Sequence, residues 1–277
     1  SEPRCFNTDT DIHPDMSEAT VTKQRRGINW ARVNWWVVIG IGAMHLGALA
    51  AFLPMFFSWS GVALLVFFCW LSGGVGITLT FHRLLTHRSF KTPKWFEYVL
   101  TTCGCLAWQG GPVNWVGTHR IHHKHSDTDE DPHTPHHGFT WAHVLWCMHK
   151  DGEDGMASED AAKDLLRDPG QRWLNRWFAL PQFVLIGLLL GVGWWVGGWE
   201  LGVSWIVWGV FLRTVLVFHG TWFVNSAAHT WGYQNFKTGD SSTNLWWVAL
   251  VSFGEGWHNN HHAHQRSAAH GMKWYEF

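Results

Sequence analysis

The chain has 277 residues, of which 23 are tryptophan and 20 are histidine, whereas only 15% are charged. This composition excludes a coiled coil and a chain that is a disordered tail over its whole length, since both are rich in charged residues. The formal net charge is −1, so the chain lacks the surplus of positive charge that binding to a nucleic-acid backbone requires. We therefore expect no nucleic-acid partner.

Residues 1–32 are polar and contain no apolar run of the kind that a cleavable secretory signal needs. We predict a poorly ordered tail over residues 1–32 and a single domain over residues 33–277. None of the five cysteines forms a CxxC pair, so we expect unpaired thiols in a reducing compartment. They are Cys5, Cys69, Cys103, Cys105 and Cys147.

Two long stretches are nearly free of charge. Residues 34–81 contain no charged side chain, and this length is enough for two bilayer-spanning helices of about 20 residues each. Pro, Ser and Gly between Pro54 and Gly61 predict a turn, which gives spans over residues 35–57 and 59–80. The second stretch gives spans over residues 177–199 and 201–224. The latter contains Arg213, which we expect to face protein or water, because a charge in the middle of a bilayer is costly.

The sequence thus predicts an all-α, multi-pass membrane protein with four transmembrane helices in two hairpins. Four basic residues precede the first span: Lys23, Arg25, Arg26 and Arg32. The segment between the second and third spans is also rich in basic residues, whereas both hairpin turns are almost uncharged. Because positive charge favours the cytoplasmic side, we expect both termini and the central segment on the cytoplasmic or stromal-equivalent side.

Histidine motifs lie beside the predicted spans. His82 and His87 come where the second span ends, five residues apart. Five residues of α-helix turn through about 500°, so these two rings are expected to point about 140° apart and to serve different metal ions. Asn225 and His229 lie four residues apart at the end of the fourth span.

Two further motifs, HRIHH at residues 119–123 and HNNHH at residues 258–262, place histidines at i, i+3 and i+4. This spacing brings three imidazoles near one face of a helix, so each motif is expected to present three ligands to one place. Imidazole binds iron, zinc, copper and nickel, and one ion rarely takes more than about six ligands, so we predict two transition-metal ions.

The remaining histidines that we considered are isolated and are expected not to bind metal, with His45 and His219 hydrogen-bonded inside the bundle. They are His13, His45, His125, His136, His137, His149, His219, His264 and His270. A rival site would use carboxylates in Glu-x-x-His pairs on helices. The segments 130–133 and 255–258 match this pattern, but Pro132, Gly254 and Gly256 disfavour regular helix there, and partner Glu residues on the apolar helices are missing.

The segments FHRLLTHRSF, GTHRIHHKHSDTDEDPH, TWFVNSAAH and GEGWHNNHHAH together resemble the histidine boxes of the integral-membrane fatty-acid desaturases, in the Δ9 branch. The resemblance covers residues 29–275 and keeps the family's order and approximate spacing. It implies a cytoplasmic-side helical cap that holds a di-iron centre. The ligands carried over by position are His82, His87, His119, His122, His123, His229, His258, His261 and His262, with Asn225 holding a metal-bound water.

The resemblance also implies the reaction. O2 and two electrons serve to remove two hydrogens from adjacent methylenes of a saturated acyl chain, which leaves a cis double bond at Δ9. Unactivated methylenes offer no acid, base or leaving group, so a metal must carry out the difficult step while the protein positions the chain. A lipid-linked acyl chain with ferredoxin as separate electron donor is favoured. Acyl-CoA with cytochrome b5 is the alternative. In either case the donor is expected to be a separate protein, because we expect no fused cytochrome b5 domain.

Two other functions were weighed. A related di-iron lipid hydroxylase would share the ligands, whereas a metal transporter would place them within the bilayer along a pathway rather than beyond the span ends. The residues that match the bend of the family's acyl tunnel are Gln109, Trp115, Thr221 and Trp222. The carboxylates expected to orient imidazole N–H groups are Asp127, Asp129, Asp131 and Glu255. The chain ends 15 residues after His262, where relatives usually continue, so we expect a truncation.

Overall fold

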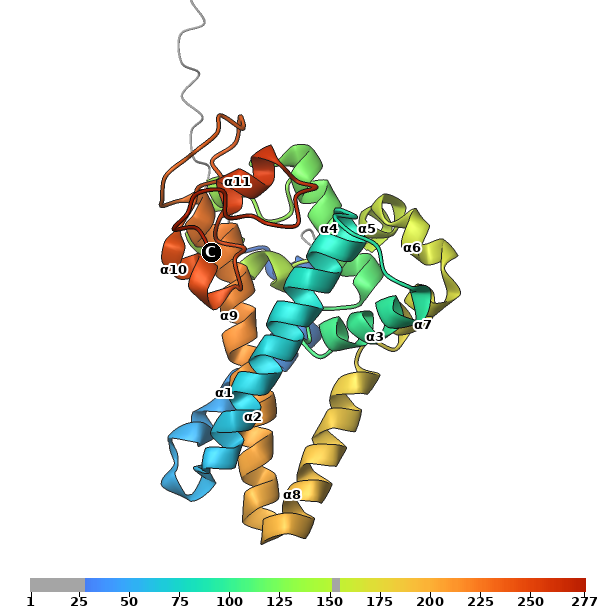
Figure 1. Ribbon diagram of the computed structural model, residues 1–277, viewed down its shortest axis with the longest axis vertical. Coiled ribbons are helices and arrows are strands. Elements are labelled where there is room, and N and C mark those ends of the chain that lie inside the picture. Colours follow the sequence, from blue (N-terminus) through green and yellow to red (C-terminus); the bar gives the residue numbers. More distant parts are fainter. Residues whose placement is uncertain (1–27, 151–154) are drawn as a thin grey trace, which may run out of the picture.

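Long apolar helices form one half of the molecule and a cap of shorter helices forms the other (Figure 1). The computed structural model describes residues 28–150 and 155–277. The predicted tail therefore lies largely outside the described residues. Its last part is ordered, since Trp30–Arg32 form a short 3-10 helix in which the Asn29 side chain accepts a hydrogen bond from the backbone N–H of Ala31.

Three helical stretches are long and apolar enough to cross a membrane: Trp35–Phe52, Trp59–Thr86 and Leu180–His229. The first contains α1 (Trp35–Leu49), followed by the short 3-10 helices η2 (Ala50–Phe52) and η3 (Pro54–Phe56). The turn predicted at Pro54 is present, and α2 (Trp59–Cys69) begins after Ser58, whose side chain caps the helix by accepting from the N–H of Gly61.

The second stretch is longer than predicted. The helix α2 continues directly into η4 (Trp70–Thr86), a π-helix that extends beyond the expected end at residue 80. Its apolar part packs tightly against the cap helix α3 (Lys94–Cys105). A Cβ atom on Gly104 would lie 2.3 Å from the Phe81 ring, so only glycine allows this approach. The membrane helix thereby carries His82 and His87 directly into the cap.

The third stretch, 50 residues long, reverses direction within α8 (Leu180–Ile206). Gly197 and Gly198 leave the helical conformation there, and the positive φ of 80° at Gly198 favours glycine. The chain then returns through η8 (Val207–Leu212) and α9 (Arg213–Ser226), so the two legs stand side by side in Figure 1.

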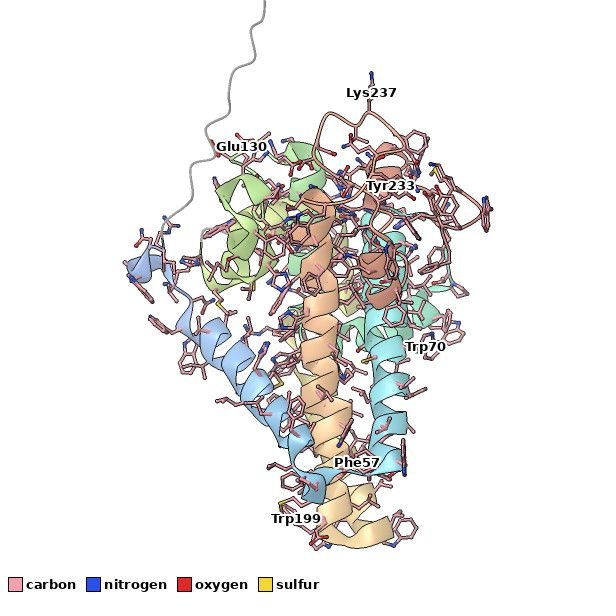
Figure 2. The ribbon with its side chains drawn as sticks, turned by 90° about the vertical axis from the view of Figure 1, so that its left-hand side faces the viewer. Phe57, Trp70, Glu130, Trp199, Tyr233 and Lys237 are labelled. Carbon is pink, nitrogen blue, oxygen red and sulfur yellow. The ribbon has the colours of Figure 1, made fainter. Side chains whose placement is uncertain are left out.

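Within its described residues, the cap consists of short helices joined by loops, among them a long loop over residues 230–245 with an isolated β-bridge between Tyr233 and Asn244. Its elements between the second and third stretches are α3, α4 (Pro112–His125), η5 (Pro135–His137), η6 (Trp141–Leu145), η7 (Trp146–Met148), α5 (Gly155–Ala161), α6 (Lys163–Arg167) and α7 (Pro169–Arg176). After α9 come η9 (Ala227–His229), α10 (Trp246–Val251) and α11 (His258–Ala263). The side-chain view places Phe57 and Trp199 at the end of the molecule opposite Glu130 and Lys237 (Figure 2).

Two expectations about single residues are met. Arg213 is fully buried among protein groups: its guanidinium donates to Gln182 Oε1 at 2.9 Å, to the carbonyl of Gly209 at 3.2 Å and to the carbonyl of Leu106. Cys69, Cys103 and Cys105 are free thiols, while Cys147 donates to the carbonyl of Val144 and Cys5 lies outside the described residues.

Replacing Arg213 tests this buried hydrogen-bond network. The substitution Arg213→Ala leaves the oxygens of Gln182 and Leu106 buried without their donor, so we expect the free energy of unfolding to fall by roughly 2–4 kcal/mol. Unfolding by denaturing detergent, followed by tryptophan fluorescence, measures the change. The exposed Arg172 is the matched control, and Arg172→Ala should leave the curve within about 0.5 kcal/mol of the wild type. Equal curves for both variants would contradict the assignment.

Candidate metal centre

Two groups of histidines meet where the apolar helices enter the cap. Within each group the ligand nitrogens all lie within 4.8 Å of one another. The five-histidine group comprises His82, His87, His119, His123 and His261, and the four-histidine group comprises His122, His229, His258 and His262. These are the nine histidines that the family resemblance assigns as ligands, and their division into two groups agrees with the expectation of two ions.

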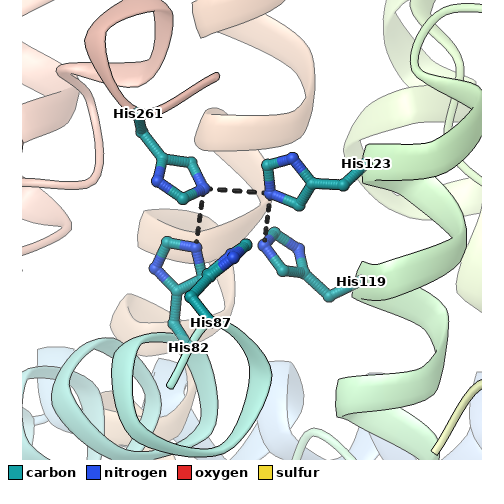
Figure 3. A group of neighbouring side chains, drawn as sticks. All are labelled: His82, His87, His119, His123 and His261. Carbon is teal, nitrogen blue, oxygen red and sulfur yellow. Dashed lines mark hydrogen bonds between the residues drawn. The ribbon is translucent and has the colours of Figure 1, made fainter. Parts of the chain in front are cut away.

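The rings of the five-histidine group face a common centre (Figure 3). His261 Nε2 lies 3.0 Å from His82 Nε2 and 2.9 Å from His123 Nε2, and His123 Nε2 lies 3.0 Å from His119 Nε2. In the four-histidine group, His262 Nε2 lies 3.0 Å from His258 Nε2 and 3.3 Å from His122 Nε2. Within each group, the Nε2 atoms therefore converge on a common point.

The expectation that His82 and His87 serve different ions is wrong. In a π-helix the hydrogen bonds join residues i and i+5, and the N–H of His87 donates to the carbonyl of His82 at 3.1 Å. The wider turn brings residue 87 back over residue 82, so their ring centroids are only 4.8 Å apart. Both rings consequently belong to the five-histidine group.

The expectation that the three histidines of each HxxHH motif act as ligands at one place is also wrong. On α4, His119 and His123 join the five-histidine group, whereas His122 joins the four-histidine group. On α11, His258 and His262 belong to the four-histidine group and His261 to the other. Residues at i+3 and i+4 lie on opposite sides of residue i around the helix axis, about 100° apart. Each of the two helices therefore lies between the two groups and supplies histidines to both.

Carboxylates contact the outer nitrogen of four of these rings. His122 Nδ1 donates to Asp131 at 2.9 Å and His262 Nδ1 donates to Asp240 at 2.6 Å. His82 Nδ1 lies 2.7 Å from Glu255, and His229 Nδ1 lies 3.1 Å from Asp127. A carboxylate at Nδ1 holds the proton on that nitrogen and leaves the lone pair of Nε2 pointing toward the centre.

The electrostatics of the site favour ionised carboxylates and, for several of the histidines, neutral rings, whereas Asp131 raises the pKa of His122 against the effect of burial. Burial holds the pKa of the His258 and His261 imidazoles well below the ordinary value, and neighbouring histidines lower it further. Burial also lowers the pKa of His262, to about 4, against the opposing effect of Asp240. Burial alone would raise the pKa of Glu255, but Arg83 and His82 hold it well below its usual range. Neutral imidazole is the form that binds metal.

The donor set fits metal ions. Several imidazole lone pairs directed at one point repel one another unless a cation lies between them, and buried nitrogens without a partner are costly. The Nε2 atoms of His87 and His229 are buried and have no hydrogen-bond partner among the described residues. All-histidine ligation suits transition metals such as iron rather than magnesium or calcium, which prefer oxygen.

An apolar cavity adjoins both groups. Its wall includes His82 and His119 of the five-histidine group and His258 of the four-histidine group, together with Asn225. Most of the remaining lining is apolar or small: Gly73, Ile77, Trp115, Val217, Gly220, Val224, Val251 and Phe253. The cavity therefore leads from the interior of the helix bundle to the metal centre.

Of the four residues matched to the tunnel bend, three form one hydrogen-bonded cluster. Gln109 Nε2 donates to Thr221 Oγ1 at 2.9 Å, and Trp115 Nε1 donates to Gln109 Oε1 at 3.2 Å. Trp115 and Thr221 line the cavity. Trp222 is buried elsewhere, against the rings of Phe218 and His143.

Sequence reasoning missed several neighbours of the centre. Asp240 lies in a loop 22 residues before His262, and no motif links the two residues. His270, expected to be isolated, lies 3.3 Å from Glu255 and forms a possible metal-binding group with His82 and Glu255. His133 forms another such group with His122 and Asp131. Asp129, by contrast, lies at the surface beside His137.

The other isolated histidines have local partners. His45 Nδ1 donates to the carbonyl of Ile41, and its Nε2 lies 3.2 Å from His219 Nε2, inside the bundle as expected. His149 Nδ1 donates to the carbonyl of Leu145, and His125 pairs with Glu130. His13 lies outside the described residues. The rival carboxylate site is not formed by Glu130, whose side chain is 70% exposed.

The fold and the site together define a class of protein: a helical membrane protein in which two groups of histidines, suited to binding metal, lie beside an apolar cavity. A model of the fatty acid desaturase family matches residues 58–277. The sn-1 stearoyl-lipid 9-desaturase of Anabaena variabilis is 52% identical over 261 residues, which cover 94% of this chain and 90% of that protein.

Two further relatives extend the comparison. The sn-2 palmitoyl-lipid 9-desaturase of Nostoc sp. (strain 36) is 48% identical over 251 residues, covering 90% of this chain and 85% of that protein. The acyl-CoA 5-desaturase AL21 of Anemone leveillei is 42% identical over 266 residues, covering 94% and 79%. The chain belongs to the membrane fatty acid desaturase family, and it is an integral membrane oxidoreductase.

Substitutions on α4 test the ligand assignment. The change His122→Ala removes one ring of the four-histidine group and leaves Asp131 without its partner, so we expect bound metal to fall by about half or more and desaturation to be lost. Metal content of the purified protein, determined by mass spectrometry, is the measurement. His125→Ala on the same helix is the control and should retain the wild-type content. Full metal content in His122→Ala would overturn the ligand assignment.

Proposed function

We propose that the protein is a di-iron acyl-lipid desaturase that introduces a cis double bond at Δ9 of a saturated acyl chain. The observation that carries this proposal is the set of nine inward-facing imidazoles beside an apolar cavity. The reaction consumes O2, two electrons and two protons; with the two hydrogens taken from the acyl chain, it yields the alkene and two molecules of water. When bound, the two irons supply the oxygen chemistry that no side chain supplies.

Each part of the chain has a distinct task in this proposal. The nine histidines hold the two irons, and Asn225, which lines the cavity next to His258, holds a water on the metal. The carboxylates of Asp127, Asp131, Asp240 and Glu255 hold protons on the outer ring nitrogens. A buried, apolar cavity keeps bulk water from the reacting methylenes.

The cavity positions the acyl chain. Ile77, Val217 and Val224 offer an apolar wall, so a saturated chain binds by burial of its methylenes. The cluster of Gln109, Trp115 and Thr221 is placed to set the bend of the chain, because its hydrogen bonds hold the Trp115 ring against His119 at a centroid distance of 5.1 Å. This geometry would present one pair of methylenes to the metal centre.

The same proposal includes the membrane topology. The turn at Gly197 and Gly198 divides the third apolar stretch into two legs, which supports four spans in two hairpins. Exposed apolar side chains on α1 and α8, such as Trp36, Leu46 and Trp195, suit contact with lipid. The cap and both termini then lie on the cytoplasmic or stromal-equivalent side, where a soluble electron donor such as ferredoxin reaches them.

The acyl carrier is tested by a product profile. In a Δ9-deficient host that expresses this chain with a matched electron donor, a short pulse of labelled stearate should yield cis-Δ9 product first in intact membrane lipids. Gas chromatography of separated lipid and acyl-CoA pools, with location of the double bond, is the measurement. Product that appears first in acyl-CoA would instead support the acyl-CoA alternative, and a hydroxylated product would show a hydroxylase.

The substitution Trp115→Ala tests whether the cluster of Gln109, Trp115 and Thr221 sets the bend of the acyl chain. Loss of the indole widens the cavity beside His119, so we expect the double bond to spread over neighbouring positions while metal content stays unchanged. Mass spectrometry of derivatised products gives the position. Trp95→Ala, at a residue that is 68% exposed, is the control. A product mixture identical to that of the wild type would reduce Trp115 to a packing role.

A further inference from the structure

The surface hollow lined by residues 262–267 brings one histidine of the metal centre to the outside of the cap. His262 Nε2 faces His122 and His258 within the four-histidine group, while its Nδ1 donates to Asp240 at 2.6 Å. His82, His119 and His258 line the acyl cavity instead. His262 therefore connects the centre to a surface that the acyl chain does not use.

The loop that carries Asp240 is held firmly against α11. Asp240 Oδ1 accepts from Thr238 Oγ1 at 2.7 Å and from the N–H of Ser242 at 3.0 Å. The side chain of Asn259 accepts from the N–H of Phe236 at 2.9 Å, one residue away from His258. The path from the loop surface through Asp240 to His262 is thus short and already in place.

This surface presents positive charge. Lys237, Arg266 and Lys273 are exposed. The three carboxylates between residues 231 and 277 all point inward: Asp240 to His262, Glu255 to Arg83, and Glu276 to Asn260. Lys237 projects at the end of the molecule opposite Phe57 and Trp199, and so away from the apolar legs (Figure 2).

We propose that this donor face, defined by Lys237, Asp240, His264 and Arg266, docks a one-electron carrier protein with an acidic face, of the ferredoxin class. Electrons pass to the centre by way of Asp240 and His262. The inference rests on the proposed function, since desaturation draws two electrons per double bond from outside the substrate. Two reduced carriers each give up one electron, and the acyl C–H bonds supply the other two that reduce O2 to water.

The charge pattern around the face also orients the carrier. Complementary charge raises the rate of encounter and suppresses wrong poses. Asp129 and Glu130, whose side chains are 95% and 70% exposed, form an acidic edge beside this face, because Asp127 of the same segment accepts a hydrogen bond from the N–H of Ser241. An acidic carrier is repelled by that edge and attracted to Lys237 and Arg266. This orientation directs the iron–sulfur cluster of the carrier toward the Asp240 loop.

The double variant Lys237→Glu/Arg266→Glu tests the proposal in iron-loaded enzyme in lipid nanodiscs. With photoreduced plant-type [2Fe–2S] ferredoxin, stopped-flow reduction should slow by about tenfold or more at low salt, and the decline of the rate with ionic strength should disappear. Turnover driven by photoreduced deazaflavin, a neutral small molecule, should match the wild type. Binding of oxidised ferredoxin, measured by biolayer interferometry, should weaken in parallel.

The matched control is Lys163→Glu/Arg167→Glu on α6, which makes the same change of charge on another part of the cap. If the donor-face variant kept the reduction rate, salt dependence and ferredoxin affinity of this control, the docking proposal would be overturned. Reduction of the wild type by cytochrome b5 but not by ferredoxin would overturn the choice of carrier. Failure of deazaflavin-driven turnover in the wild type would instead contradict the proposed function, while ferredoxin affinity would still test the docking.

Discussion

The convergence of nine imidazole nitrogens on two points is the constraint on which the rest of the structure depends. Carboxylates lie beside Nδ1 of four of the rings, and Asp131 and Asp240 accept a hydrogen bond there, which leaves the Nε2 lone pairs of His122 and His262 facing inward and suited to a cation. Asp127 and Asp131 follow α4, Asp240 lies in a long loop, and Glu255 precedes α11. The surroundings of the centre therefore come from segments that lie far apart in the cap's sequence.

The apolar helices supply the rigid support for this centre. Because η4 continues α2 without a break, a membrane helix carries His82 and His87 to their place, and close contact at Gly104 locks it against α3. Arg213 links the third apolar stretch to the same bundle, because its guanidinium donates to Ser72 Oγ at 3.4 Å and to the carbonyl of Leu106. The cavity between these elements then opens directly onto the metal centre, where an acyl chain is to be oxidised.

The centre is reached from separate sides. His82, His119 and His258 face the acyl cavity, whereas His262 faces Asp240 and the positively charged donor face. Under the proposed function and the proposed docking, this separation would let a lipid substrate and a soluble carrier act on one centre without competing for the same surface. The motif HNNHH on α11 takes part in both approaches, because His258 lines the cavity and His262 donates from Nδ1 to Asp240.

Local chemistry in the sequence was sufficient to predict the apolar spans, the buried environment of Arg213 and the histidines of the centre, because hydropathy and ligand type are properties of single residues. The division of ligands between the two groups was not predictable. It depends on the π-helical turn at His87 and on α4 and α11 lying between the groups, which tertiary packing decides. Asp240 and His270 were likewise invisible in the sequence, since their contacts with His262 and Glu255 arise only when separate segments fold together.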